Sequence, residues 1–482
     1  MAILSDLPPE LVEMILHGLG SIDDVHNMGI TCKKTYDVIR RSEIYMEIMR
    51  SVIGCAPQHR YDLQLCKMLS LHQDIVEHVR QHSTLLPTTQ GSHQGFAYNK
   101  WESALVSAAT VTTCDDACCA ACLPDNAIHG ILARYQGLRV LEDLWLERQL
   151  KASDFFIAEE SSGTSQVPLA QRYTRVLHRN ELYRDGKISS RRKSTPETAG
   201  YTSLNADQRA RFYSAVVCVW LFNELRWVLT NFRHASNFDM QIRLLETCRK
   251  HILKQSLTPL LDELDRCAVF RFMYHHLLPV YGACLADQAT AALPFTFSTN
   301  FGSDYGYTSR LLQLFISSGE TYLQPPDLIE LVLHHNTSRE PPWPLSTFSA
   351  STQAWQHPSP FFAFPTALDL DLLGERHKRA VLGNSLTHLN MIARSSIHQT
   401  SAHRSPVIAA PPLDKAYRMR DLAGNFYLEG ALIAFEKHED GGAGTKEMRK
   451  LFPERWGEEL WSVWWWANSE DKARAKMERW KR

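Results

Sequence analysis

The stretch LSDLPPELVEMIL, residues 4–16, decides how the N-terminus folds, and it is unusual because it is apolar on more than one side. Wound as a helix from Pro8, with about 100° between successive residues, it carries apolar side chains over roughly twice the arc that a surface helix needs. Its polar side consists only of Glu10, Glu13, His17 and Gly18. The apolar positions are Leu11, Val12, Met14, Ile15, Leu16 and Leu19. One side can face a core, so something else must cover the other.

Three short helices are predicted to follow one another over residues 4–41. Gly18 and Gly20 end the first helix. Ser21 caps the second, with Asp24 three residues on, as in a capping box, and Thr31 starts the third. Helices this short bury too little surface to be stable alone, yet their apolar side chains exceed what they can cover for one another. This pattern is typical of a small module that a partner completes.

The same residues resemble the F-box family. Its pattern is Leu-Pro-x-Glu-Leu, an isoleucine-leucine pair, a further leucine, an acidic-hydrophobic turn, and a third helix that opens with Ser/Cys-Lys-Arg. The positions that match it in order are Leu7, Pro8, Glu10, Leu11, Ile15, Leu16, Leu19, Asp24, Val25, Ile30, Cys32, Lys33 and Lys34. The family's third-helix aromatic, often tryptophan, is here Tyr36, one position away. The turn at Gly20–Asp23 is one residue longer than the commonest spacing.

This resemblance implies a trihelical F-box over residues 1–48 that binds the Skp adaptor of a cullin-RING ubiquitin ligase. It also implies that the remaining chain, residues 49–482, selects an unknown protein client. The adaptor contacts that the resemblance implies are Leu7, Pro8, Leu11, Ile15, Leu19, Val25, Ile30 and Cys32. On this interpretation the adaptor covers the second side of the opening helix.

Helical periodicity dominates the rest of the chain, whereas alternating strand patterns bounded by Asn-Gly or Asp-Gly are absent. Apolar residues recur with a helical period at 59–82, 126–151, 205–227 (with Asn205 as the cap), 325–336, 367–398 and 453–481. We therefore predict an all-α protein, in which the trihelical head is followed by a large, irregular α-helical region. A subdivision of that region would fall near residues 185–204 or 337–366, where polar, proline-rich or serine-rich segments interrupt the periodicity.

Size and charge narrow the function classes. The 482 residues exceed what one hydrophobic core usually spans, which favours two or more units. A hydrophobic content of 44% with 22% charged residues is typical of a folded protein. The 52 basic and 53 acidic residues leave a net charge of −1, which argues against nucleic acid or an anionic membrane as a partner.

Cysteine usage and the N-terminus predict a compartment. The eleven cysteines are odd in number and irregularly spaced, and no basic segment followed by an apolar one opens the chain. The most apolar run, FYSAVVCVWLF at 212–222, is too short to span a bilayer. We expect a soluble protein of the cytoplasm or nucleus with reduced thiols.

Two segments of the C-terminal region have a weaker resemblance. SLNADQRARFYSAVVCVWLF at 203–222 and YLQPPDLIELVLHHN at 322–336 resemble parts of large F-box families expanded in filamentous fungi. In those families an all-helical C-terminal region, mostly of unknown substrate, follows the F-box. The resemblance thus points the same way as the helical periodicity.

The segment TCDDACCAACLPD at 113–125 is the most plausible metal site. Structural zinc usually takes two pairs of ligands from separate segments, whereas here all the cysteines lie in one stretch and His129 is the only nearby imidazole. These cysteines are Cys114, Cys118, Cys119 and Cys122. The pattern favours a buried helix that ends at Pro124 and packs inert thiols. Zinc binding and a redox pair of Cys119 and Cys122 are the alternatives.

No catalytic constellation is found. GGAGTKEMRK at 441–450 lacks the Gly-Lys-Ser/Thr of a phosphate loop, and the adjacent pairs His275-His276 and His334-His335 cannot chelate as residues four apart would. We therefore expect no cofactor, no metal and no enzymatic activity. The tail carries Trp456, Trp461, Trp464, Trp465, Trp466 and Trp480, which favour sealing a core edge over anchoring a partner. If a client groove exists, this tail and FFAF at 361–364 are predicted to line it.

The sequence thus predicts an F-box substrate receptor. The alternative from another class is a non-catalytic helical scaffold or regulatory protein that uses its F-box-like head outside a ligase. An unrecognised helical enzyme is a third, less favoured reading. Cullin-dependent turnover of a bound client would separate the first two.

Overall fold

The computed structural model describes residues 6–83, 98–112, 119–147, 204–231, 238–254, 256, 258–281, 324–337, 435, 448, 451–452, 455 and 467–482. Within these ranges the chain is α-helical and forms no strand, which confirms the predicted fold class. The helical elements are α1 (Pro9–His17), α2 (Ile22–Gly29), α3 (Lys33–Ile39), α4 (Ser42–Cys55), the 3₁₀ turn η2 (Pro57–His59), α5 (Asp62–Ser83), α6 (Tyr98–Thr110), α7 (Asp125–Glu147), α9 (Ala206–Asn231), α10 (Phe238–Leu253), α11 (Pro259–Arg271), the π-helical turn η5 (Phe272–Leu277), α12 (Leu278–Tyr281), α15 (Pro325–Asn336) and α22 (Glu470–Lys481).

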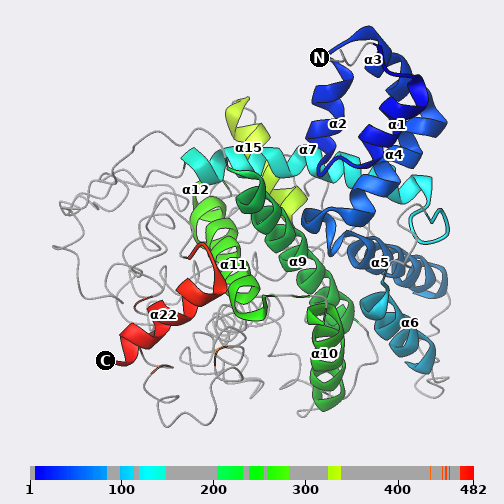
Figure 1. Cartoon of the computed structure of the whole chain (residues 1–482). Coiled ribbons are helices and arrows are strands. Elements are labelled where there is room, and N and C mark those ends of the chain that lie inside the picture. The colour runs from blue at the N-terminus through cyan, green and yellow to red at the C-terminus, as the bar shows by residue number, and fades with distance from the viewer. Residues whose placement is uncertain are drawn as a thin grey trace, which may run out of the picture.

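Helices α1 to α4 form the N-terminal unit, which Figure 1 shows in dark blue at one end of the molecule, next to α7. Within it α1 packs on α3 and α4, and α2 packs on the same two helices. Its core is small and apolar. The side chains of α1 to α3 in this core, all nearly or fully buried, are Val12, Leu16, Ile22, Val25 and Val38.

Local sequence signals set the ends of these helices. Ser21 caps α2 as predicted, because its Oγ accepts a hydrogen bond of 3.1 Å from the Asp24 backbone N–H. The third helix starts later than predicted. Its N-cap is Cys32, and the hydroxyl of Thr31 instead donates to the Met28 carbonyl at 2.7 Å, where it closes the end of α2.

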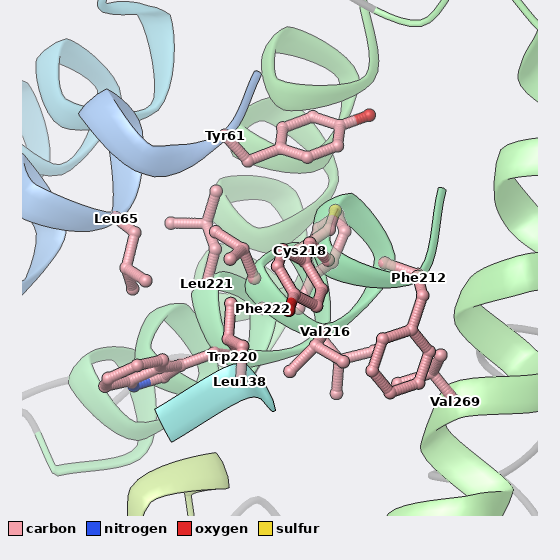
Figure 2. Close-up of a cluster of buried hydrophobic side chains, with 14 of the residues drawn as sticks. Tyr61, Leu65, Leu138, Phe212, Val216, Cys218, Trp220, Leu221, Phe222 and Val269 are labelled. Carbon is pink, nitrogen blue, oxygen red and sulfur yellow. The ribbon is translucent and has the colours of Figure 1, made fainter. Parts of the chain in front are cut away.

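The body is built around α9, which contacts α5, α10, α11 and η2 (Figure 1). Its first turn is capped as predicted. The Gln208 backbone N–H donates to Asn205 Oδ1 at 2.8 Å, and the Asn205 N–H donates to Gln208 Oε1 at 3.1 Å. Every side chain of α9 from Phe212 to Leu225 is buried, because neighbouring helices pack around this part of it. Figure 2 shows its central side chains meeting Leu65 of α5, Leu138 of α7 and Val269 of α11.

Helix α11 attaches to its neighbours through buried ion pairs as well as apolar packing. Asp262 pairs with Arg60 at 2.8 Å, and Asp265 forms two bonds of 2.6 and 2.7 Å with Arg211 of α9. Such pairs demand close geometry, so they restrict how α11 can sit against its neighbours.

Glu263, on the same turn of α11, accepts from Arg249 of α10 and lies near Arg266, each at 2.9 Å. Arg266 is only 1% exposed, so its charge depends on this carboxylate. Three acids from one helix thus bind arginines of the neighbouring elements and of α11 itself.

The predicted helix through residues 113–123 is wrong where the structure describes it. Residues 119–123 form a single turn, closed by a 3.0 Å bond from the Leu123 N–H to the Cys119 carbonyl. Pro124 disfavours the helical conformation at Leu123, the residue directly before it, and α7 begins directly afterwards. Cys119 and Cys122 are half-buried, not packed in a core. Cys114 and Cys118 lie outside the described residues.

The helices predicted at 59–82, 126–151, 205–227 and 325–336 correspond to α5, α7, α9 and α15, although α5 begins at Asp62 and residues 148–151 lie outside the described residues. The 453–481 segment is not one continuous helix. Residues 467–469 are non-helical, and Ser469 caps α22 by accepting from the Lys472 N–H at 3.3 Å. Trp480 is half-buried against the core beside Phe452, with ring centroids 5.6 Å apart. The other tail tryptophans, residues 361–364 and the predicted helix at 367–398 lie outside the described residues.

Candidate functional site

Helix α1 has three sides with three different environments. Val12 and Leu16 point into the core and are fully buried. About 120° away in each direction lie a polar side and a second apolar side, as a 100° step per residue requires. On the polar side, Glu13 Oε1 and His17 Nε2 lie 3.9 Å apart. The second apolar side consists of Leu11, Met14 and Ile15, whose side chains are 43%, 68% and 39% exposed.

Two further exposed apolar side chains belong to the same unit. Ile30, directly after α2, is 80% exposed, and Tyr36 of α3 is 52% exposed. Among the described residues, the only other large hydrophobic side chain with comparable exposure is Leu333 of α15. Single exposed apolar residues are ordinary, whereas a concentration on one small unit marks an interaction site. We call Leu11, Met14, Ile15, Ile30 and Tyr36 together the exposed apolar surface.

The N-terminal unit matches a known family. The family model of the F-box domain matches residues 4–47. The chain carries an F-box domain. Domains of this kind bind Skp1 within cullin-RING ubiquitin ligases and are typically found in non-catalytic adaptors. No curated protein and no solved structure matches the chain.

The F-box match ends at Glu47, inside helix α4. That helix continues without a break to Cys55, and its second half is buried. It thus carries the chain from the F-box domain directly into η2 and the body. No separate linker lies between the two parts.

The structure separates the predicted adaptor contacts into accessible and inaccessible ones. Pro8, Leu11, Ile15 and Ile30 are exposed. Leu7, Leu19 and Cys32 are half-buried. Val25 differs from the rest, because its side chain is fully buried in the core of the F-box domain. In this structure it is part of the core and not of the exposed apolar surface.

Sequence reasoning left two members of the exposed apolar surface out of the predicted contacts. Met14 is the most exposed apolar residue of α1, and the helical wheel contained the signal, since Met14 shares an arc with Leu11 and Ile15. Tyr36 was noticed only as a departure from the family pattern. Its exposure could not be read from α3 alone, because a seven-residue helix has little periodicity.

Cys32 has a distinctive environment at the start of α3. Its thiol lies 3.5 Å from the Thr35 hydroxyl, and that hydroxyl donates to the Cys32 carbonyl at 2.8 Å. Hydrogen bonding from the Thr35 side chain and backbone lowers the pKa of the Cys32 thiol below its ordinary value. The thiols of the body behave differently. Burial raises the pKa of Cys218 and of Cys248 to about 12.

Other predicted features fall outside a functional site. In the described part of the chain, no group of three or more His, Cys, Asp or Glu side chains is placed to hold a metal ion. His334 and His335 lie in the last turn of α15, where His334 Nε2 is 3.4 Å from Glu330 Oε1 and the His335 ring contacts Tyr281. The side chains of His275 and His276 are outside the described set. None of the described helices is long and apolar enough to cross a bilayer.

Proposed function

We propose that this chain is the substrate-recognition subunit of a Skp–cullin–F-box ubiquitin ligase. The observation that carries the proposal is the exposed apolar surface on a domain that matches the F-box family. The F-box domain binds the Skp adaptor, and residues 49–482 bind a protein client. The chain performs no chemistry itself. It raises the effective concentration of the client near a ubiquitin-charged enzyme.

The physical basis of adaptor binding is the burial of side chains that the folded chain leaves in water. Completely burying a leucine, isoleucine or methionine contributes about 1.5–3 kcal/mol, and a side chain already half-buried contributes roughly half of that. Leu11, Met14, Ile15 and Ile30 therefore supply a substantial driving force, to which Tyr36 adds an amphipathic ring.

The contacts proposed for the adaptor combine sequence and structure. From the sequence come Leu7, Pro8, Leu11, Ile15, Leu19, Ile30 and Cys32, and from the structure Met14 and Tyr36. Val25 is not among the proposed contacts, because its side chain is fully buried in the core. The client-binding role of the body and a location in cytoplasm or nucleus belong to the same proposal, since a ligase of this class would act on intracellular clients.

The first experiment co-expresses the full chain with the Skp adaptor and measures the dissociation constant. The variant Leu11→Asp/Ile15→Asp places two charges where the adaptor would exclude water, so binding should weaken by about 100-fold or more. Both positions are partly exposed, so the variant should still fold. The matched control is Leu333→Asp, which makes the same chemical change at a 50% exposed residue of α15. It should bind like wild type.

Two results would overturn the proposal. If well-folded wild type does not bind the adaptor, the F-box domain is only a layer of the helical body. If the adaptor binds but a cross-linked client shows no cullin-dependent turnover, the chain is a scaffold that uses its F-box domain outside a ligase.

A further inference from the structure

The N-terminal unit, helices α1 to α4, is joined to helix α7 and the turn before it at two separate places. The first is Arg50 of α4, which is 8% exposed. Its Nε donates to the Leu123 carbonyl at 3.0 Å, and its Nη2 pairs with Asp125 in the first turn of α7. This attachment lies where α4 runs into the body, so it reinforces a connection that the chain already makes.

The second attachment is Asp23, in the first turn of α2. Its side chain is 13% exposed and lies against two helices of the body. Tyr135 of α7 donates its hydroxyl to Asp23 Oδ2 at 2.9 Å, and Arg139 of α7 donates to Oδ1 at 3.1 Å. Arg209 of α9 is the third partner and the second positive charge, with its Nη1 3.8 Å from Asp23 Oδ2.

We call the three partners of Asp23, which are Tyr135, Arg139 and Arg209, the socket. Contacts within the body hold Tyr135 and Arg209 in place. Glu142 accepts from Arg209 Nε at 3.1 Å and Nη2 at 3.0 Å, and it also accepts from the Tyr213 hydroxyl at 2.7 Å. The rings of Tyr135 and Tyr213 meet edge to face, with centroids 5.1 Å apart. These contacts lie within the body and do not involve Asp23.

The charges around the socket leave one positive charge to be balanced by a further carboxylate. Arg139 and Arg209 bring two positive charges, of which Glu142 balances one. Asp23 balances the other. Burial and the neighbouring Asp23 raise the pKa of Tyr135, so its hydroxyl keeps the proton that it donates.

The two attachments are far enough apart along α7 that together they resist rotation of the N-terminal unit about either one. Ten residues of α7 separate Asp125 from Tyr135 and fourteen separate Asp125 from Arg139, which corresponds to about 15–21 Å along the helix. Figure 1 shows α2 and α4 both meeting α7 from the same side. A unit held only at α4 can tilt about that point, whereas a second attachment on another helix prevents the tilt.

We infer that Asp23 is a positioning residue, which fixes the F-box domain in one orientation on the body. The functional value of this fixed orientation rests on the proposed function. A ligase receptor holds its client in a defined position relative to the adaptor, so an F-box domain that tilts would misplace the client. The attachment itself is a property of this chain alone and is tested without any partner.

The experiment measures the distance distribution between two labels in the full chain. Unnatural amino acids carrying a donor and an acceptor dye replace Glu43, exposed on α4, and Lys250, exposed on α10. Wild type should give one narrow distribution. Asp23→Ala should broaden it about twofold or add a second population, because it removes the polar attachment of α2 to α7 and α9.

The matched control is Asp24→Asn, a carboxylate of the same helical turn whose described partner is Ser21 within the F-box domain. It removes a charge from the same end of α2 and should leave the distribution unchanged. Arg139→Gln provides a second variant, since Arg139 is 58% exposed and its loss cannot unfold the body. It should give an intermediate broadening.

A purely structural role would lower the melting temperature without changing the distance distribution. The inference is overturned if Asp23→Ala and Arg139→Gln both give the wild-type distribution. Adaptor affinity is measured on the same variants and should stay within about twofold of wild type, because Asp23 is not part of the exposed apolar surface. If wild type does not bind the adaptor, the proposed function is contradicted, but the positioning result stands.

Discussion

The F-box domain and the body treat their large side chains in opposite ways. The F-box domain buries a small core and leaves Leu11, Met14, Ile15, Ile30 and Tyr36 substantially in water. Among the described residues of the body, only Leu333 is a large hydrophobic side chain with similar exposure. The body even buries charged groups such as Arg266 and Glu263, and neutralises them in pairs. The described part of the body covers nearly all of its large hydrophobic side chains itself, whereas the F-box domain leaves several that a partner can cover.

This contrast also separates how each part tolerates substitution. Burial inside a finished core makes a residue sensitive, because no other group can replace its partners. A residue on a surface that awaits a partner is sensitive only in binding. Four predictions follow the contrast from its largest expected effect to its smallest.

The sharpest test lies within α1 itself. Val12→Asp puts an unpaired carboxylate into a fully buried site and should lower the free energy of unfolding by more than about 4 kcal/mol, enough to unfold the F-box domain. Ile15→Asp, three residues on, should change it by less than about 1 kcal/mol, since Ile15 is 39% exposed. Chemical denaturation measures both. Equal effects would show that α1 has only one environment.

The buried pairs of α11 predict the next largest effect. Glu263→Gln leaves the guanidinium groups of Arg249 and Arg266 without their carboxylate and should cost about 3–5 kcal/mol. Asp471→Asn, an exposed carboxylate at the start of α22, is the control and should cost less than about 1 kcal/mol. A cost below about 1 kcal/mol for Glu263→Gln would mean that water reaches Arg266.

Asp62 predicts how stability depends on pH. Burial opposes its charge, but the His59 hydrogen bond at 2.8 Å and Arg134 at 3.1 Å outweigh burial and lower the pKa of this carboxyl. Because the folded pKa lies below the unfolded one, near 3.9, this stabilisation is present at neutral pH and is lost as the pH falls through the folded value.

Asp62→Asn should therefore be less stable than wild type at pH 7, because it leaves Arg134 unpaired. The difference in unfolding free energy should shrink as the pH falls below about 4. Urea denaturation at several pH values measures this difference. A constant gap across that range would contradict the assigned ion pair.

The smallest effect concerns thiol chemistry and leaves the fold unchanged. Cys32 is half-buried with a lowered pKa, so iodoacetamide should label it with a pH midpoint below the usual value of about 8.5. Cys218 is fully buried and its pKa is raised to about 12, so it should stay unlabelled in the native protein. Peptide mass spectrometry distinguishes the two. Adaptor binding should protect Cys32 if it lies in the proposed interface.

The sequence predicted the features that depend on residues close together in the chain. Ser21 and Asp24, and Asn205 and Gln208, cap their helices through bonds that span three residues. The helical ranges of the body and the F-box pattern are local or fixed in spacing for the same reason. The prediction was wrong at residues 119–123, where the structure has a single turn before α7 and not a helix that ends at Pro124.

Other features required the folded chain. Val25 and Ile30 both match the family pattern, yet one is fully buried and the other is 80% exposed. No sequence signal linked Asp23 to Tyr135 and Arg139, which are more than a hundred residues away.

The sequence by itself therefore determined that this protein is helical, that its first helices form an F-box, and which side chains exceed what that small unit can bury. Only the tertiary structure decided which of those side chains stay exposed and how the F-box is held on the body. The physical reason is the range of the interactions. Caps and periodicity act within a few residues, whereas burial and buried ion pairs join residues that meet only after the chain has folded.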